Sequence, residues 1–422
     1  MPATLVSFLG TGRRERPDAR RSGYVKTTYV FPETPGEPPF EDRTSLFGAA
    51  LLRYLRNRRR MPVKRWIVLG TSASLWSDLT EALNDPGALA DEWVSIDEKV
   101  VARSIQQSDL DAWQQRLNAV ADGLDCRLCR VGEALDPVSQ QQVCRALFDN
   151  IPPGDDVVFD ISHGFRHQPV IAGFVISLMR WTHGIRRVSF YSGVLEAGDR
   201  DRNRAPVIEL PICQELIEGT ESAAVLELTG NYTPLASTLG LPGELAWFLE
   251  NTNQLPQAKR PATELLRALP SPPETEADVV REPLAALLRD RLNWAVKANI
   301  ADRYRANAEH ALVHGDYFRA VVLAFEALLV RAILELLPGR DPMNYDVRSQ
   351  AADMVWGRLL GDDRELFKRL QWTRNACAHG CRSGEAPAQR ILSNPAEFSG
   401  LIRDAMGLFD RWTDVLNPGG RP

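Results

Sequence analysis

Two short segments of this 422-residue chain concentrate residue types that do chemistry. The first, FDISHGFRHQP, covers residues 159–169 and places an acid, a hydroxyl, two histidines, a glycine and an arginine between two apolar runs. In the second, RNACAH, four residues separate Arg374 from His379. Loop N–H groups, hydroxyls and arginines bind phosphates, whereas an arginine and a histidine together can cleave a phosphodiester. The first segment therefore indicates a receptor for a charged ligand, and the second a catalytic pair.

Small polar loops follow three of the expected strands. In an open parallel sheet, ligands bind beyond the carboxyl ends of the strands, where glycines let backbone N–H groups approach an anion. No loop matches a dinucleotide or P-loop fingerprint, so a dehydrogenase is disfavoured. We expect Asp160 to cap the loop that follows it. The candidate ligand-binding residues are Gly10, Thr11, Gly12, Thr71, Ser72, Ser162, His163, Gly164, Phe165 and Arg166.

The second segment carries a guanidinium and an imidazole, which can act on a phosphodiester without a metal, and RNA brings its own nucleophile in the 2′-hydroxyl; that RNA is the substrate is implied by a resemblance described below. Histidine exchanges protons near neutral pH, and arginine stabilises the negative charge that builds on the phosphate. The candidate catalytic residues are Arg374, Asn375 and His379. Arg374 falls on the apolar stripe of the expected helix. Its charge there is explained by snorkelling to the edge, by a pairing partner or by an anion in a shared cleft, and Glu326 from a neighbouring helix is one candidate partner.

The elements that position the first segment alternate between strand and helix. Segments such as 65–70 and 155–161 predict buried strands, and 139–151 and 168–181 predict helices. Alternation of this kind predicts an α/β, Rossmann-like domain over residues 1–215, with a mostly parallel sheet and helices on both faces. We expect residues 206–212 to add an edge strand, and 74–83 to form a helix.

The second half predicts a different fold class, all-α. Residues 216–281 contain a stretch rich in proline and charge, which indicates a linker or an inserted helical segment. Residues 282–422 predict a helical domain in which 283–304 and 316–337 are long amphipathic segments. We expect one apolar stripe on 316–337 and a helix over 363–380 that ends at Gly380.

The motif D-I-S-H-G-F-R after a strand resembles the DxTHG motif of CRISPR-associated proteins with a CARF sensor domain. The segments SFLGTG, TTYVF and LGTS occur in a similar order over the first half of the chain. Ser162 replaces the threonine of that family and keeps the hydroxyl. The resemblance implies a homodimer whose shared pocket binds cyclic oligoadenylate through the candidate loops. A two-fold receptor suits a ring of repeating units.

The R-N-x-x-x-H pattern resembles the R-x4-H motif of HEPN ribonucleases, which are helical and act as dimers. Together the two resemblances imply a CARF–HEPN endoribonuclease of type III CRISPR systems, activated by cyclic oligoadenylate, most simply cyclic tetra-adenylate. The implied substrate is single-stranded RNA and the implied product carries a 2′,3′-cyclic phosphate. We expect no cofactor, no metal and no stable place in an effector complex.

Two alternatives stay open. A ligand-responsive regulator or scaffold would use the helical domain only to dimerise or to bind a partner, and would tolerate the loss of Arg374 and His379. A ring nuclease would degrade its own cyclic ligand, with Ser162, His163 and the Thr11 loop positioning a ribose hydroxyl. Product analysis of the incubated ring separates degradation from simple binding.

Composition limits the remaining possibilities. The net charge is −5, so any nucleic-acid contact is local, and residues 13–21 and 56–65 are basic segments that we interpret as a solvated loop and a helix end. No signal peptide or membrane span is apparent, so we expect a soluble, cytoplasmic protein. We interpret the C-x-x-C of Cys126 and Cys129 as structural, and His310 and His314 as packing residues.

Overall fold

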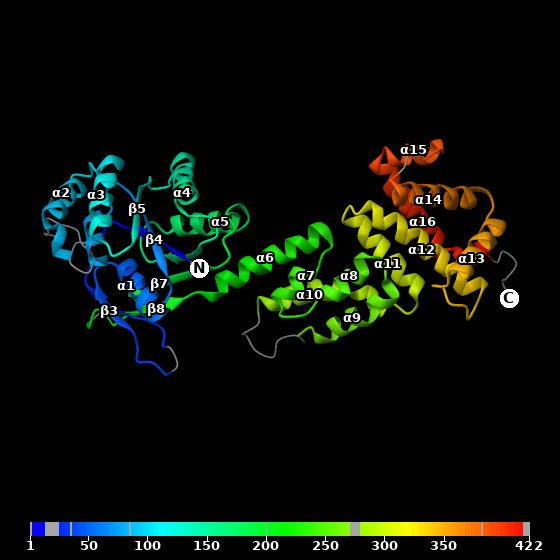
Figure 1. Cartoon of the computed structure of the whole chain (residues 1–422), viewed down its shortest axis with the longest axis horizontal. Helices are drawn as coiled ribbons and strands as arrows, with labels where there is room; N and C mark the ends of the chain where they lie inside the picture. Colours follow the sequence, from blue (N-terminus) through cyan, green and yellow to red (C-terminus); the bar gives the residue numbers. More distant parts are fainter. Residues whose placement is uncertain are drawn as a thin grey trace. The chain divides into compact units, whose positions relative to one another are not determined.

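The computed structural model describes residues 2–12, 25–33, 36–83, 86–199, 201–270, 279–380 and 383–416. The basic segment 13–21 lies outside the described residues. The chain forms two compact units, Met1–Ile217 and Glu218–Pro422 (Figure 1). Among the described residues, no helix combines the length and the apolar character required to cross a membrane.

The first unit is built on an eight-stranded, mostly parallel sheet in the described part of the chain. The strands are β1 (Ala3–Leu9), β2 (Thr27–Val30), β3 (Glu41–Thr44), β4 (Val63–Gly70), β5 (Asp125–Arg130), β6 (Asp156–Asp160), β7 (Val188–Gly193) and β8 (Arg204–Glu209). Their order in the sheet is β3-β2-β8-β7-β6-β1-β4-β5, with antiparallel pairings at β7–β8 and β2–β3. The expected edge strand at 206–212 is wrong, because β8 pairs with β2 on one side and with β7 on the other.

Helices cover both faces of this sheet, as the alternating pattern predicts. They are α1 (Phe47–Arg53), α2 (Ala90–Val101), α3 (Gln107–Val120), α4 (Pro137–Asn150) and α5 (His167–Thr182). Strand β1 is buried along its whole length, and its side chains alternate between two cores. Leu5 and Leu9 pack with α1, α2 and α3, whereas Val6 and Phe8 pack with α4 and α5. A central parallel strand buried on both faces reads as a continuous apolar run.

Two local features of the first unit differ from the sequence expectation. The segment 74–83 forms 3₁₀ turns over Trp76–Ala82 rather than an α-helix. The indole of Trp113 donates to the Trp76 carbonyl at 3.1 Å, which holds the start of this segment against α3. Helix α2 was not expected from the sequence. Its buried apolar residues are Ile96 and Val100, which lie on one narrow stripe of the helix.

Over its described residues, the second unit contains helices and the loops that connect them, and its first helix, α6, begins within the last residues of the first unit. The helices are α6 (Pro211–Thr229), α7 (Thr233–Thr238), α8 (Glu244–Asn251), α9 (Leu255–Ala268), α10 (Arg281–Arg291), α11 (Ile300–Val313), α12 (Tyr317–Leu336), α13 (Tyr345–Arg358), α14 (Gly361–His379), α15 (Ala386–Leu392), α16 (Pro395–Asp410) and α17 (Trp412–Leu416). Residues Leu235, Ala246 and Leu255 of α7, α8 and α9 belong to the same core as the later helices. Much of the range 216–281 is therefore part of the helical unit.

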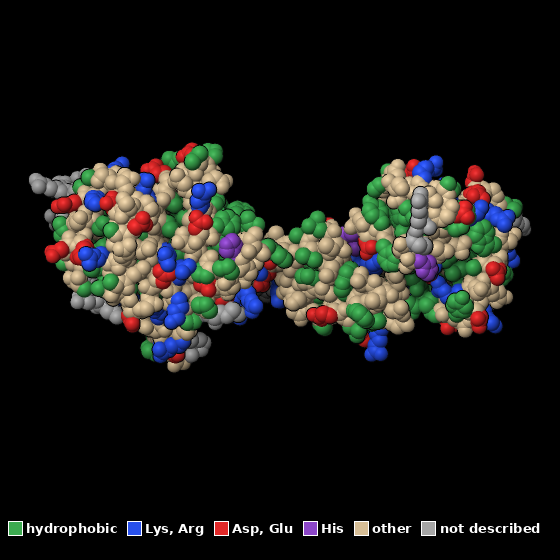
Figure 2. Space-filling view, turned by 45° about the horizontal axis from the view of Figure 1, so that its top comes forward, with side chains coloured by type: hydrophobic (Ala, Val, Ile, Leu, Met, Phe, Trp, Pro, Cys, Tyr) green, Lys and Arg blue, Asp and Glu red, His purple; other side chains and the backbone are tan. Residues whose placement is uncertain are grey.

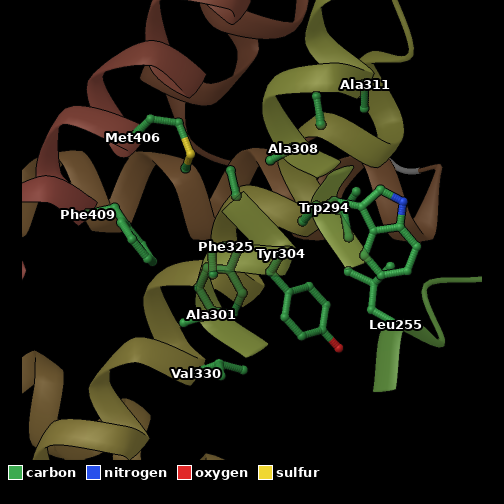
Figure 3. Packing of buried hydrophobic residues seen from close by; sticks show 14 of the residues in the cluster. Leu255, Trp294, Ala301, Tyr304, Ala308, Ala311, Phe325, Val330, Met406 and Phe409 are labelled. Carbon is green, nitrogen blue, oxygen red and sulfur yellow. The ribbon is translucent and has the colours of Figure 1, made fainter. Parts of the chain in front are cut away.

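Helix α12 forms the centre of this unit. It packs against α11, α13, α14 and α16, and Figure 3 shows Phe325 and Val330 of α12 among side chains of α11 and α16. Nearly every position from 319 to 333 is buried, so burial extends around the helix beyond the apolar stripe that the sequence predicts. A helix that is apolar all round belongs in the interior. The segment 283–304 is also not continuous, because a 3₁₀ turn that buries Trp294 separates α10 from α11.

Candidate functional site

The sheet brings the polar loops of the first unit together at one edge. Strands β4, β1, β6 and β7 are consecutive and parallel, and their registers align Leu9 with Gly70 and Ser7 with Asp160. The loops that follow Leu9, Gly70 and Asp160 therefore leave the same carboxyl edge side by side. This edge is where an open parallel sheet binds ligands.

Ser74 joins two of these loops, and sequence reasoning missed it. Its hydroxyl donates to the Leu9 carbonyl at 2.5 Å and accepts from the Thr71 backbone N–H at 2.9 Å. The Leu75 N–H also donates to the Gly10 carbonyl at 3.0 Å. Thr71 is buried by these contacts, whereas Ser72 is half-buried. A serine two positions after Ser72 carries no sequence signal that separates it from an ordinary loop serine.

The described residues directly after β1 are partly accessible to solvent. Gly10 and Gly12 are half-buried and Thr11 is exposed. Gly12 has φ 65°, a left-handed conformation that glycine adopts without strain. Thr11 is therefore accessible to a ligand through its hydroxyl and its backbone.

Asp160 and Ser162 fix the loop after β6. The Ser162 N–H donates to Asp160 Oδ1 at 2.8 Å, as predicted for a capping aspartate. The Ser162 hydroxyl accepts from the Gly193 N–H at 2.8 Å, which ties the loop to the end of β7. Asp160 is fully buried, and burial raises the pKa of its carboxyl to about 6. These contacts give both side chains a structural role.

The turn at Gly164 requires glycine. Its φ is 86°, and a Cβ there would lie 2.8 Å from Phe8 Cβ. Gln168 closes the turn, because its Oε1 accepts from the Phe165 N–H at 3.2 Å. The Phe165 ring is exposed and stacks on His167 with 5.7 Å between ring centres. The turn thus presents an aromatic ring at its tip.

His163 and Arg166 differ in their environment. His163 is half-buried in the loop, and burial lowers the pKa of its imidazole to about 4. Its imidazole is therefore neutral at neutral pH and adds no cation to the loop. Arg166 is exposed at the start of α5, where it adds a permanent charge to the partial positive charge of the helix N-terminus. This combination suits an anionic ligand.

In the second unit, Glu326 and Arg374 meet across two helices. Glu326 of α12 is 9% exposed and surrounded by apolar neighbours. Its Oε1 lies 3.8 Å from Arg374 Nη2 of α14. The partner that the sequence suggests for Arg374 is thus the one that it contacts. A carboxylate buried among apolar neighbours needs such a cation.

Arg348 of α13 pairs with the other oxygen of Glu326. It also donates to the Pro342 carbonyl at 3.1 Å. Burial lowers the pKa of Arg348, and the nearby charge of Arg374 lowers it further. Sequence reasoning missed Arg348, because nothing in its local pattern marks it and only the helix packing brings it to Glu326. The carboxylate therefore holds two guanidiniums at one point.

Arg374 is held in a defined orientation. Its Nη1 donates to Asn375 Oδ1 at 2.9 Å, and its guanidinium carbon lies 5.5 Å from the centre of the Phe325 ring. The side chain remains one-third exposed. A guanidinium fixed by a carboxylate, an amide and an aromatic face, with solvent on one side, can clamp a phosphate.

His379 lies at the last position of α14 and is exposed. Gly380 ends the helix with φ 60°, as the sequence predicts for a C-cap. Five positions along an ideal helix, from Arg374 to His379, correspond to about 7.5 Å of rise and about 140° of rotation. The imidazole is therefore on the same helix end as the arginine and accessible to a substrate.

The other marked residues pack as ordinary structure. His310 and His314 stack with 4.0 Å between ring centres, and burial lowers the pKa of His310 to about 2. Burial raises the pKa of both Cys126 and Cys129 to about 12, so neither thiol is reactive at neutral pH. Arg65, from the second basic segment, pairs with Asp125. Over the described ranges, no group of three or more His, Cys, Asp or Glu is arranged to hold a metal ion.

Comparison with known proteins gives a distant relative. The chain is 26% identical over 234 residues to the CRISPR-associated protein MJ1674 of Methanocaldococcus jannaschii. The match covers 52% of this chain and 35% of that protein, so the chain spans about a third of the length of its relative. No protein-family model matches the chain. The chain is therefore similar, over half its length, to a CRISPR-associated protein.

Proposed function

We propose that this protein is a CRISPR-associated endoribonuclease whose helical unit cleaves single-stranded RNA and whose sheet-containing unit binds an activating cyclic oligoadenylate. The observation that best supports this proposal is the position of Arg374. Glu326 and Asn375 hold its partly exposed guanidinium, and its helix ends at the exposed His379. The similarity to a CRISPR-associated protein supports this class of function.

The chemistry uses the RNA as its own nucleophile. An imidazole takes the proton of the 2′-hydroxyl, O2′ attacks phosphorus, the P–O5′ bond breaks, and the leaving O5′ receives a proton. The products are a 2′,3′-cyclic phosphate and a 5′-hydroxyl. Arg374 offsets the charge that develops on the phosphoryl oxygens. One imidazole serves one proton transfer at a time, so two copies of the Arg374–His379 pair in a homodimer supply both the base and the acid.

A homodimer also suits the first unit. The outer face of α5 carries four exposed apolar side chains at helical spacing, namely Val170, Phe174, Leu178 and Trp181. Their exposed fractions run from 53% to 77%, and a stripe of this kind is typical of a protein interface. The stripe begins one turn after Arg166, so the proposed interface is next to the candidate loops. A ring of adenylates would then contact the same loops from two copies.

The contacts of the loop after β6 favour binding of the ring over its degradation. Ser162 is engaged with Gly193, and His163 is neutral and half-buried. The Ser162 hydroxyl is thus occupied in holding the loop to the end of β7. Gly164, Phe165 and Arg166 at the exposed turn offer backbone, aromatic and cationic contacts of the kind that a ring of adenylates needs.

The direct experiment is cleavage of a labelled single-stranded RNA with no ring, with cyclic tetra-adenylate and with cyclic hexa-adenylate. We expect one ring to raise the cleavage rate and the product to end in a 2′,3′-cyclic phosphate, with chelators having no effect. Cleavage that neither ring changes would remove the sensor role. Consumption of the ring without RNA cleavage would instead identify a ring nuclease.

A further inference from the structure

The solvent face of α14 carries a row of cationic and aromatic residues that leads to His379. Arg364, Lys368, Trp372, Asn375 and His379 follow one another at steps of four, four, three and four residues. At about 100° per residue, all five fall within about 80° of the helix circumference. They therefore form one continuous face, which we call the α14 face.

The burial pattern places this face outward. Arg364 and His379 are exposed, and Lys368, Trp372 and Asn375 are half-buried. The opposite side of α14 is buried in the second unit, and its buried residues are Leu366, Phe367, Leu370, Thr373 and Ala376. The α14 face thus lies on the solvent side of the helix.

The α14 face combines cations with an indole. The Lys368 ammonium lies 4.6 Å from the centre of the Trp372 ring, and the Arg364 guanidinium lies 5.6 Å from that of Trp356, a residue of α13. Lys368 also pairs with Glu365 at 3.6 Å, but Glu365 is 60% exposed and such a surface pair is weak. Both cations therefore remain available to a stronger anion.

We propose that the α14 face binds the single-stranded RNA substrate and guides it to the Arg374–His379 pair. This inference rests on the proposed function and adds the substrate path to it. Proteins that hold single strands combine cations for the backbone with aromatic rings on which bases stack, and the α14 face offers both. From Arg364 to His379 it extends about 22 Å, room for several nucleotides.

A protein partner fits this face less well. The α14 face has no aliphatic side chain among its five residues, in contrast to the apolar stripe on α5. Figure 2 shows acidic and basic side chains interspersed over the visible surface, so the RNA contact is local rather than part of a broad basic surface. The charge of the face and its continuity with His379 both favour RNA.

The test measures RNA binding without cleavage. In the full-length His379→Ala protein, the affinity for a fluorescein-labelled oligouridine is followed by anisotropy over a series of salt concentrations. We expect Trp372→Ala to weaken binding about tenfold through loss of stacking. The double variant Arg364→Ala/Lys368→Ala removes two phosphate contacts, so the slope of log affinity against log salt falls by about 1.4. Arg403→Ala, at an exposed arginine of α16, is the matched control and leaves both quantities unchanged.

The inference is overturned if both α14-face variants keep the parent affinity and the parent salt slope. If the protein that retains His379 still cleaves RNA, the proposed function stands. Variants that lose dimerisation in sedimentation and keep their RNA affinity would also overturn the inference, because the face would then bind a second copy of the chain. Absence of RNA cleavage by the parent protein under every ring condition would instead refute the proposed function itself.

Discussion

Arg374 of α14 and Glu326 of α12 lie 3.8 Å apart, at the boundary between an apolar core and solvent. The same carboxylate pairs with Arg348, so one negative charge serves two guanidiniums. This arrangement leaves a net positive charge beside an exposed face, which attracts a phosphate. It also makes Glu326 the residue on which the orientation of Arg374 depends.

Replacing Glu326 with glutamine is expected to destabilise the second unit by about 2 kcal/mol, because two partly buried guanidiniums lose their counter-charge. Thermal unfolding measures this change. Glu335→Gln is the matched control, since Glu335 lies on the same helix and pairs with an arginine, Arg331, four residues before it. We expect a smaller loss there. An equal effect of the two substitutions would show that Glu326 has no special role.

His379→Ala is expected to lower RNA cleavage at least about 100-fold, because proton transfer by a positioned side chain contributes roughly that much or more. His379 is exposed, so the free energy of unfolding should change by less than about 0.5 kcal/mol. Cleavage rates and urea midpoints of the same preparation check both statements. Cleavage at the parent rate would remove the catalytic assignment.

Gly164→Ala is expected to destabilise the first unit and to abolish ring binding. The new Cβ meets Phe8 Cβ at 2.8 Å, and the backbone has φ 86°. Gly154→Ala separates the two causes, because Gly154 has φ 82° but a Cβ there would meet no atom within 4 Å. The difference between the two variants in unfolding free energy reports the clash alone, and we expect more than about 1 kcal/mol. Equal losses would mean that backbone strain explains both.

The buried carboxyl of Asp160 is expected to make the stability of the first unit depend on pH. Burial raises its pKa to about 6, against about 3.9 in an unfolded chain. Between these values the folded state holds a proton that the unfolded state has lost, so stability falls as pH rises through this window, by up to about 3 kcal/mol. Asp160→Asn removes this contribution, so its stability relative to the parent should improve from pH 4 to pH 7. Urea midpoints of both proteins at the two pH values measure it, and a constant difference would contradict the prediction.

Local signals in the sequence predict much of the architecture. The alternation of apolar strands and amphipathic helices predicts the parallel sheet, and Gly380 predicts the end of α14. The capping role of Asp160 also follows from its place two residues before Ser162. These features can be predicted because they depend only on local sequence, that is, on the periodicity of apolar residues and on the conformational preferences of single residues.

The sequence by itself determined the residue types at the strand ends and along α14, and therefore the chemistry that each segment offers. Only the tertiary structure decided that β8 inserts between β2 and β7, that Ser74 joins two loops, and that Arg348 shares Glu326 with Arg374. These relationships join residues far apart in the chain. Their geometry follows from how whole helices and strands pack, which no local pattern encodes.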